Sequence, residues 1–241
     1  MKQLHLVAAL LGSLACSAFA QESEIKASLE ATLPGAKVEH VTATAVNDIY
    51  QVELSSGQVI HATGDGKHIF GGDLFELKDG KLKNLTEDYR SISRVDALNT
   101  LQDKDLVVFP AQGVEKAQVY VFTDVTCGYC MKFHSEVPEL NSKGVTVKYA
   151  AWPRAGAQSE VGATMRDVWC SADRRAAMNK AKTRQPVEHA KDSCTNQVIV
   201  DQVKLGMKMG VDGTPAVFDK QGRKLGGYVP ADALVQMLTQ K

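Results

Sequence analysis

The chain has 241 residues, of which 44% are hydrophobic and 23% charged, which is ordinary for a globular protein. Lysine plus arginine and aspartate plus glutamate number 28 each, so there is no net positive charge to attract nucleic acid. The composition therefore predicts one large globular domain or two small ones, with no nucleic-acid partner.

The N-terminus has the features of a secretory signal peptide. Residues 4–14 are mostly apolar, and residues 18–20 form the small-x-small pattern that signal peptidase cleaves. Cleavage after Ala20 is predicted, which in a Gram-negative bacterium would deliver the mature protein to the periplasm. Cys16 leaves an alternative, a lipoprotein signal acylated on that cysteine, although Ser13 stands where such signals usually carry leucine.

Residues 21–84 are predicted to form a small α+β domain. It opens with an amphipathic helix that carries Ile25, Leu29 and Leu33 on one face and ends at Pro34-Gly35. Short strand-like runs separated by turn sequences follow at residues 38–46, 49–54, 59–63, 67–70 and 74–77. One helix on one antiparallel sheet of about 60 residues gives a marginal core, so pairing with a second copy would bury more apolar surface.

A linker helix is predicted within residues 85–106. Thr86 is a candidate N-cap, and residues 103–105 end the helical pattern. One apolar stripe is formed by Tyr89, Ile92, Val95, Leu98 and Leu101. Periodicity alone leaves open whether this helix holds two domains apart or packs wholly within one core.

Residues 107–241 alternate strands and helices, which predicts an α/β domain. Strands are expected at residues 118–123, 145–151, 216–218 and 225–228. Helices are expected from the first cysteine pair to about residue 141, across 158–209 with a break near 185–186, and at 231–239. This order of elements, βαβ then ββα with a helical insertion between them, is the thioredoxin arrangement.

Two cysteines one turn apart open the first helix of this domain, in the motif Cys127-Gly128-Tyr129-Cys130. A thiolate at a helix N-terminus faces unpaired backbone N–H groups and the positive end of the dipole, which lowers the thiol pKa. Cys127 is therefore the expected nucleophile and the more buried Cys130 the expected resolving thiol. Gly128 is expected to leave the approach to Cys127 open.

A zinc site is the alternative for a CxxC motif, since His134 lies one turn beyond it. A closed structural site needs four ligands, and Cys170 and Cys194 lack a matching CxxC spacing. No metal and no cofactor are therefore expected. Cys170 and Cys194 are interpreted as a structural disulfide across the helical insertion, with a second redox pair as the alternative.

Thr214-Pro215 is the second element of the predicted site. It lies about 85 residues beyond the CxxC motif and directly before a predicted strand, where an X–Pro bond can be cis. In a thioredoxin-like fold this loop faces the cysteine pair, and its backbone can pair with an extended client chain.

These motifs resemble the DsbC/DsbG family of periplasmic protein disulfide isomerases. The resemblance is carried by residues 122–130, Trp169-Cys170, Cys194 and residues 213–217, and it extends to residues 65–69 in the N-terminal half. It implies a homodimer in which N-terminal domains pair, with Gly72 at the dimer sheet and two thioredoxin-like domains facing a cleft. It also implies that Thr214 and Pro215 flank the active cysteines and that a membrane reductase of the DsbD type keeps them reduced.

The resulting prediction is an isomerase that rearranges wrong disulfides in misfolded exported proteins. Cytosolic thioredoxins carry a buried aspartate six residues before the first cysteine, and here that position is Val121. Without that carboxylate nothing there raises the thiol pKa by repulsion, so a Cys127 pKa well below the free value of about 8.5 is expected. The alternatives are a net dithiol oxidase that uses the same cysteines and a holdase chaperone with secondary redox activity.

Overall fold

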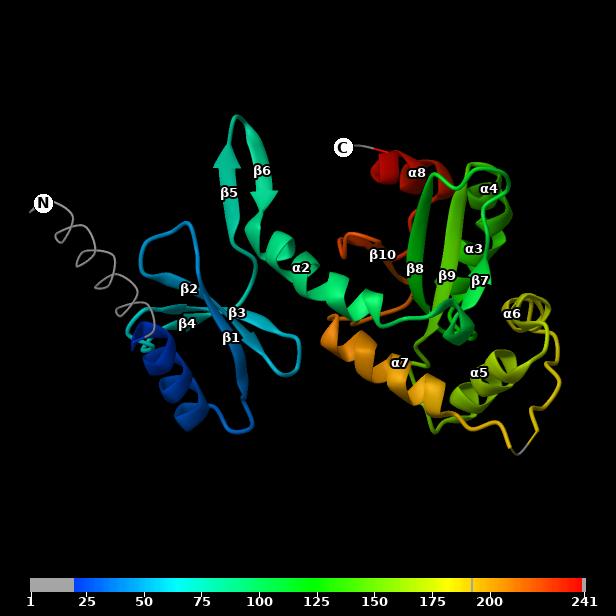
Figure 1. The fold of residues 1–241 in the computed structure, drawn as a ribbon, viewed down its shortest axis with the longest axis horizontal. Helices are drawn as coiled ribbons and strands as arrows, with labels where there is room; N and C mark the ends of the chain where they lie inside the picture. The colour runs from blue at the N-terminus through cyan, green and yellow to red at the C-terminus, as the bar shows by residue number, and fades with distance from the viewer. Residues whose placement is uncertain (1–19, 192, 240–241) are drawn as a thin grey trace, which may run out of the picture. The chain divides into compact units, whose positions relative to one another are not determined.

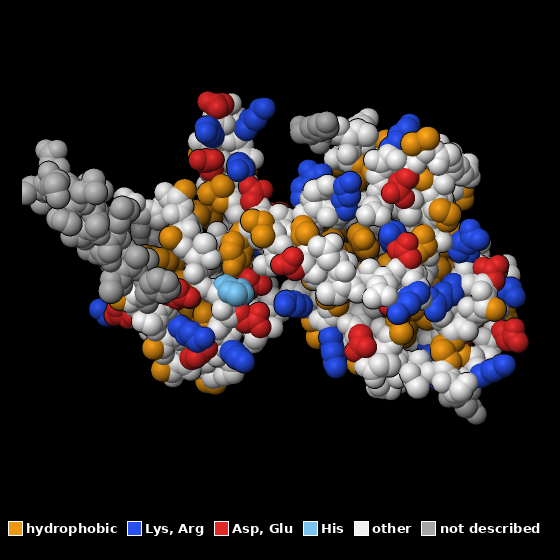
Figure 2. All heavy atoms as spheres, in the orientation of Figure 1, with side chains coloured by type: hydrophobic (Ala, Val, Ile, Leu, Met, Phe, Trp, Pro, Cys, Tyr) orange, Lys and Arg blue, Asp and Glu red, His pale blue; other side chains and the backbone are white. Residues whose placement is uncertain are grey.

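The structure, a computed structural model, describes residues 20–191 and 193–239 (Figure 1). The chain divides between Thr86 and Glu87 into two compact units. The predicted signal peptide up to residue 19, including Cys16, lies outside the described residues. Within the described ranges no helix has both the length and the apolar character needed to cross a membrane. On the face seen in Figure 2, side chains of both charges are interspersed over both units.

The first unit is built from one helix and a four-stranded antiparallel sheet. Residues 20–32 are helical and bury Ile25 and Leu29 completely or nearly so. The strands are β1 (Val38–Ala43), β2 (Ile49–Leu54), β3 (Val59–Thr63) and β4 (Ile69–Phe70), paired in that order. Val52, Ile60 and Ala62 of the sheet pack against the helix, so the predicted amphipathic face is the core of this unit.

A separate two-stranded hairpin follows the sheet, which corrects the prediction of a single sheet. Its strands are β5 (Phe75–Lys78) and β6 (Lys81–Asn84). Asp79 and Gly80 between them both have positive φ, 51° and 71°, which is the type I′ geometry that suits the twist of a two-residue hairpin. β6 was not predicted, because its alternating lysines give little strand signal.

Helix α2 (Leu85–Asn99) begins at the end of the first unit and continues into the second. Thr86 lies inside the helix, so it is not the predicted N-cap. Its hydroxyl accepts from the Leu74 N–H at 2.9 Å and bonds the ring of His61 at 3.3 Å. The predicted apolar stripe is partly wrong, because Ile92 is 71% exposed and the buried face carries Arg94, Ala97 and Leu98.

The second unit contains a five-stranded mixed sheet. Its strands are β7 (Val107–Phe109), β8 (Ala117–Thr123), β9 (Val145–Ala151), β10 (Ala216–Asp219) and β11 (Lys224–Gly226). They are ordered β11-β10-β8-β9-β7, with β8 and β9 parallel and the other pairs antiparallel. β7 follows the short helix η1 (Asp103–Asp105). It was not predicted, because only three residues pair at the sheet edge.

Helices cover both faces of this sheet. They are α3 (Gly128–Ser135), α4 (Val137–Ser142), α5 (Glu160–Cys170), α6 (Arg174–Lys182), α7 (Gln197–Lys208) and α8 (Ala231–Thr239). The predicted single helix after the cysteines is two helices, since Pro138 near the start of α4 cannot donate to a continuous ladder. The break in the insertion is also wider than predicted, because the described residues between α6 and α7 contain no helix.

The central strand β8 buries side chains on both of its faces. Val119 and Val121 belong to a core that α3 to α6 and α8 complete, whereas Tyr120 and Phe122 pack with residues of α2 and the end of α7. This alternation is the period-two pattern of a strand with both faces covered. The chain leaves β8 at its C-terminal end, and the cysteine pair follows there.

Candidate active site

The two cysteines lie where strand β8 leads into helix α3. Cys127 is the N-cap residue of α3, and its carbonyl accepts a hydrogen bond from the Met131 N–H at 3.0 Å. Cys130 lies one turn inside the helix. The Cys127 side chain is therefore at the helix end where backbone N–H groups lack helical partners and the dipole is positive.

The loop at Thr214-Pro215 lies against Cys127. The peptide bond between these two residues is cis, and β10 begins directly after it. The Cys127 thiol donates a hydrogen bond to the Thr214 carbonyl oxygen, with sulfur and oxygen 3.2 Å apart. Within the described residues the Thr214 hydroxyl is buried and has no hydrogen-bond partner. The loop thus offers an acceptor for the thiol and a spare donor for the thiolate.

The surroundings of Cys127 favour its ionised form. Burial acts in the opposite direction and raises the pKa of this thiol, because the residue is only 4% exposed. The Thr214 side chain and the backbone N–H groups of Cys130 and Tyr129 stabilise the thiolate and hold the Cys127 pKa below its ordinary value. The direction agrees with the sequence prediction, and Val121, six residues before Cys127, is fully buried and brings no charge near the thiol.

Cys130 has the opposite tendency. It is 1% exposed, and burial raises the pKa of its thiol despite the opposing charge of Lys182 and hydrogen bonding by Thr123. One cysteine of the pair is therefore stabilised as a thiolate while the other is held as a thiol. This asymmetry suits an attacking sulfur and a resolving sulfur.

Asp124 organises the turn that leads to the cysteines. Its carboxylate is buried and accepts from the backbone N–H and the hydroxyl of Thr126, both at 2.6 Å. It also accepts from the backbone N–H of Arg154 at 2.9 Å and from its guanidinium at 3.2 Å. Burial raises the Asp124 pKa, but these hydrogen bonds outweigh it and hold the pKa below its ordinary value.

A buried lysine reaches the same turn from helix α6. Lys182 donates to the Thr123 hydroxyl at 2.6 Å and to the Asp124 carbonyl oxygen at 2.9 Å. Burial lowers the Lys182 pKa to about 8, against the opposing effect of the nearby negative groups, so the amine is still mainly charged at neutral pH.

Sequence reasoning missed Lys182, Thr123 and Asp124 as members of this site. A signal for Lys182 was present, because Ala177, Met178 and Ala181 form the buried face of α6 and residue 182 falls on that face. A lysine among apolar residues of a helix face is the pattern that marks a buried cation.

His134 is a buried structural residue of α3. Its Nε2 donates to the Asn179 side-chain oxygen at 2.9 Å, and its Nδ1 accepts from the Tyr149 hydroxyl at 3.0 Å. Burial lowers its pKa to about 4, so the ring is neutral at physiological pH. Both ring nitrogens are thus hydrogen-bonded within the protein. His134 therefore has no free nitrogen to bind a metal, and its neutral ring is not a general acid at physiological pH.

Gly128 and Tyr129 form the outer surface of the motif. A Cβ placed on Gly128 would meet no atom within 4 Å, so the protein leaves open space there. Tyr129 is 65% exposed and stacks on Tyr228 with ring centroids 6.2 Å apart. Lys132 lies over the other ring, 4.6 Å from the Tyr228 centroid. These rings give the motif an aromatic, solvent-facing side.

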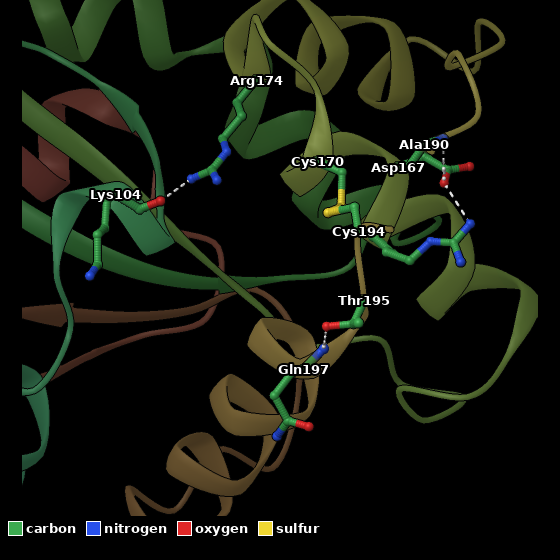
Figure 3. Close-up of a disulfide and its surroundings, with 9 residues drawn as sticks. Lys104, Asp167, Cys170, Arg174, Ala190, Cys194, Thr195 and Gln197 are labelled. Atoms are coloured by element: carbon green, nitrogen blue, oxygen red, sulfur yellow. Dashed lines mark hydrogen bonds and ion pairs between the residues drawn. A yellow bond between two sulfur atoms is a disulfide. The ribbon is translucent and has the colours of Figure 1, made fainter. Parts of the chain in front are cut away.

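Cys170 and Cys194 form a disulfide in the helical insertion (Figure 3). It joins the last residue of α5 to the loop before α7, with the two Cα atoms 6.2 Å apart. Cys127 and Cys130 are free thiols in this structure. Nearby, Asp167 of α5 accepts from the Ala190 N–H at 3.1 Å, which fixes the same loop.

Gly72 lies in the first unit, in the connection between β4 and β5. Its φ is +103°, a backbone conformation that favours glycine, and open space surrounds the position of an added Cβ. The other predicted site residues, Cys127, Cys130, Thr214 and Pro215, all belong to the second unit.

Comparison with protein families gives a match for each part of the chain. A model described as "Disulfide bond isomerase protein N-terminal domain" matches residues 16–87. A model described as "Thioredoxin-like domain" matches residues 102–241. Both predicted fold classes are therefore confirmed, the α+β N-terminal domain and the thioredoxin-like domain with its helical insertion.

Two named proteins match this chain over all or nearly all of its length, and a solved structure matches part of it. The thiol:disulfide interchange protein DsbC of Escherichia coli strain K12 is 34% identical over 242 residues, which cover 100% of this chain and 97% of that protein. DsbC of Haemophilus influenzae is 33% identical, covering 94% of each chain. The crystal structure of a disulfide interchange protein from Neisseria gonorrhoeae has a TM-score of 0.50 at 25% identity, covering 58% of this chain and all of that one. The chain is a thiol–disulfide oxidoreductase that belongs to the DsbC family.

Proposed function

We propose that this protein isomerises non-native disulfides in exported proteins through nucleophilic attack by Cys127. The observation that carries the proposal is the asymmetry of the pair, with the Cys127 pKa lowered by hydrogen bonds and the Cys130 pKa raised by burial. At neutral pH the helix-capping sulfur is then the stronger candidate to begin an exchange.

The reaction begins with both cysteines reduced. The Cys127 thiolate attacks one sulfur of a client disulfide, forming a mixed disulfide and releasing the other client sulfur as a thiolate. That thiolate attacks a second client disulfide, and a client thiolate finally displaces Cys127. Client bonds are exchanged with no net transfer of electrons.

The Thr214-Pro215 loop supports recognition of an extended client chain. The Thr214 carbonyl accepts from the Cys127 thiol in the free protein, and this contact is lost when the sulfur becomes part of a mixed disulfide. Beside it, the exposed ring of Tyr129 offers apolar contact that depends little on client sequence. Broad binding through backbone and aromatic contacts suits an enzyme that acts on many clients.

The first unit supports a homodimer. β4 is the last strand of its sheet, so one edge lacks a described neighbour, and Ile69 and Phe70 on it are 46% and 42% exposed. In the adjoining hairpin Leu77 is 83% and Leu82 63% exposed. An open edge with exposed apolar side chains is a surface that a second copy can cover by strand pairing.

The periplasm is the proposed location, with cleavage of the signal peptide after Ala20. The Cys170–Cys194 disulfide supports an oxidising compartment, since such bonds are rare in reducing ones. In that compartment the Cys127–Cys130 pair needs a reductant to remain active as an isomerase, and a membrane reductase of the DsbD type is the proposed partner.

Refolding of scrambled ribonuclease tests the function. Reduced wild-type protein is expected to restore ribonuclease activity, Cys127→Ala to lose this ability, and Cys130→Ala to keep part of it, because shuffling needs only the attacking sulfur. Isomerisation by Cys127→Ala at the wild-type rate would overturn the proposal. A resting Cys127–Cys130 disulfide in intact cells would point instead to a net oxidase.

A further inference from the structure

Helix α6 ends in a lysine that is buried instead of solvent-exposed. Lys182 is 4% exposed, whereas Lys180, two residues earlier, is exposed. The Lys182 ammonium is bound by the Thr123 hydroxyl and the Asp124 carbonyl, and it lies 5.7 Å from the centre of the Tyr149 ring. Burying a cation costs free energy, so a buried ammonium in this position is expected to stabilise a negative group nearby.

The Cys130 thiolate is a negative group that the buried Lys182 charge stabilises. The Thr123 hydroxyl oxygen accepts a hydrogen bond from Lys182, so the hydroxyl proton remains free to be donated. The Thr123 hydroxyl and the Lys182 charge both favour the Cys130 thiolate, and both oppose the burial that raises the Cys130 pKa. Lys182 thus binds Thr123 directly, and both residues act on the second sulfur.

We propose that Lys182 is a positioning residue for the resolving step: it orients the Thr123 hydroxyl toward Cys130 and supplies the positive charge that makes the Cys130 thiolate available. This inference rests on the proposed function and extends it to the second sulfur. Cys127 has separate support from Thr214 and from the N-terminal N–H groups of α3.

The step that Lys182 assists is escape from a stalled mixed disulfide. Cys130 loses its proton, and its thiolate attacks the Cys127 sulfur. A Cys127–Cys130 bond forms while the bond from Cys127 to the client sulfur breaks, and the client sulfur leaves with the electron pair and takes up a proton. The Cys130 sulfur passes from the thiol to the disulfide level and the client sulfur from the disulfide to the thiol level, while Cys127 stays at the disulfide level, so oxidation and reduction balance.

No other described group around the pair supplies a buried cation to Cys130. The Arg154 side chain is 51% exposed and is bound to the Asp124 carboxylate. His134 is neutral at physiological pH. In a mixed disulfide Cys127 carries no charge, so its repulsion of the Cys130 thiolate disappears during this step. The titratable groups that interact electrostatically with Cys130 are Lys182, Cys127, Tyr149 and Arg154, and the Asp124 charge acts on Lys182.

The effect of Lys182 depends on pH in a defined direction. The Lys182 pKa is about 8, so the ammonium is present below that pH and is lost as the pH rises through it. The help given to Cys130 is therefore largest near neutral pH and fades in alkaline solution, where Cys130 ionises without it.

A two-phase exchange reaction separates the two sulfurs. Reduced protein is mixed in a stopped-flow instrument with excess dithiobis(nitrobenzoate), which releases a coloured thiolate at each step. The first phase is attack by Cys127 and depends on reagent concentration. The second is intramolecular resolution by Cys130, does not depend on that concentration, and is absent in Cys130→Ala.

The test variant is Lys182→Met, which removes the charge and keeps a long unbranched side chain. Lys180→Met on the same helix is the matched control for loss of an exposed lysine. Each tenfold loss of Cys130 thiolate is offset about threefold by higher nucleophilicity, so the second phase at pH 7 is expected to slow by about three- to tenfold. The first phase and the control variant are expected to change far less.

The pH profile distinguishes this role from a structural one. The second phase of Lys182→Met is expected to approach the wild-type rate as the pH is raised above about 8, whereas a misfolded site would not recover. Wild-type kinetics for both phases of a folded Lys182→Met would overturn the inference and leave the function intact. A first phase that persists in Cys127→Ala would instead overturn the proposed function.

Discussion

Removal of the disulfide in the helical insertion tests whether it is structural. The bond between Cys170 and Cys194 joins the end of α5 to the loop before α7 (Figure 3). The double variant Cys170→Ala/Cys194→Ala breaks this link without leaving a free thiol. The CxxC motif is untouched, so any change in stability comes from the insertion.

The magnitude follows from the length of the closed loop. The two cysteines are 24 positions apart, and the chain-entropy relation gives about 3.5 kcal/mol for a loop of this length. Hydrogen bonds that hold the same region, such as those from Arg174 to the carbonyls of Lys104 and Leu106, remain in the variant. The folded insertion should therefore persist while the free energy of unfolding falls by about 3 to 3.5 kcal/mol.

Urea denaturation followed by tryptophan fluorescence measures this change in the second unit alone. The protein has two tryptophans, Trp152 and Trp169, and both lie in that unit. Ser193→Ala, an exposed substitution beside the disulfide, is the matched control. A loss below about 1 kcal/mol would refute the entropic reasoning. Loss of the two-phase thiol exchange would show instead that this pair takes part in redox chemistry.

Three further changes probe other parts of the account. Asp124→Asn should lower the free energy of unfolding by about 2–3 kcal/mol at pH 7. Since the folded Asp124 pKa is depressed, this stabilisation is complete above about pH 3.9 and is lost as the pH falls, so the two urea curves should converge in acid; a constant gap would contradict this. Thr214→Val should raise the pKa of the Cys127 thiol, so that thiolate absorbance rises at a higher pH during titration. An unchanged midpoint would show that the Thr214 hydroxyl does not stabilise the Cys127 thiolate. Ile69→Glu should give monomers in analytical ultracentrifugation while the exposed control Ile92→Glu remains dimeric, and a dimeric Ile69→Glu would remove β4 from the interface.

The fold was predictable where local pattern and tertiary context agree. The apolar run of β9 and the amphipathic helix α8 have the predicted bounds, Val145–Ala151 and Ala231–Thr239. β6 and β7 were not predictable, because each is short and is stabilised by the strand beside it more than by its own residues. The burial of Arg94 in α2 was also hidden, since its partners, the carbonyls of Met209 and Gly222, lie more than a hundred residues away.

The site was predictable only in the parts that a short local sequence motif marks. The CxxC motif after a strand identified the two sulfurs, and Thr-Pro before a later strand identified the loop beside them. Lys182 reaches the site from a helix that lies about fifty residues beyond Cys130, so no spacing in the sequence connects the two. The contribution of Lys182, which opposes the effect of burial on Cys130, therefore depends on contacts that only the fold brings together.

Competitive alkylation of the fully folded, pre-reduced protein tests the central claim most directly. A substoichiometric amount of iodoacetamide is added at pH 7, and the modified cysteine is located by peptide mass spectrometry. The difference in pKa between the two thiols predicts modification of Cys127 well ahead of Cys130. Equal labelling of the two, or labelling of Cys130 first, would contradict the assignment of Cys127 as the attacking sulfur.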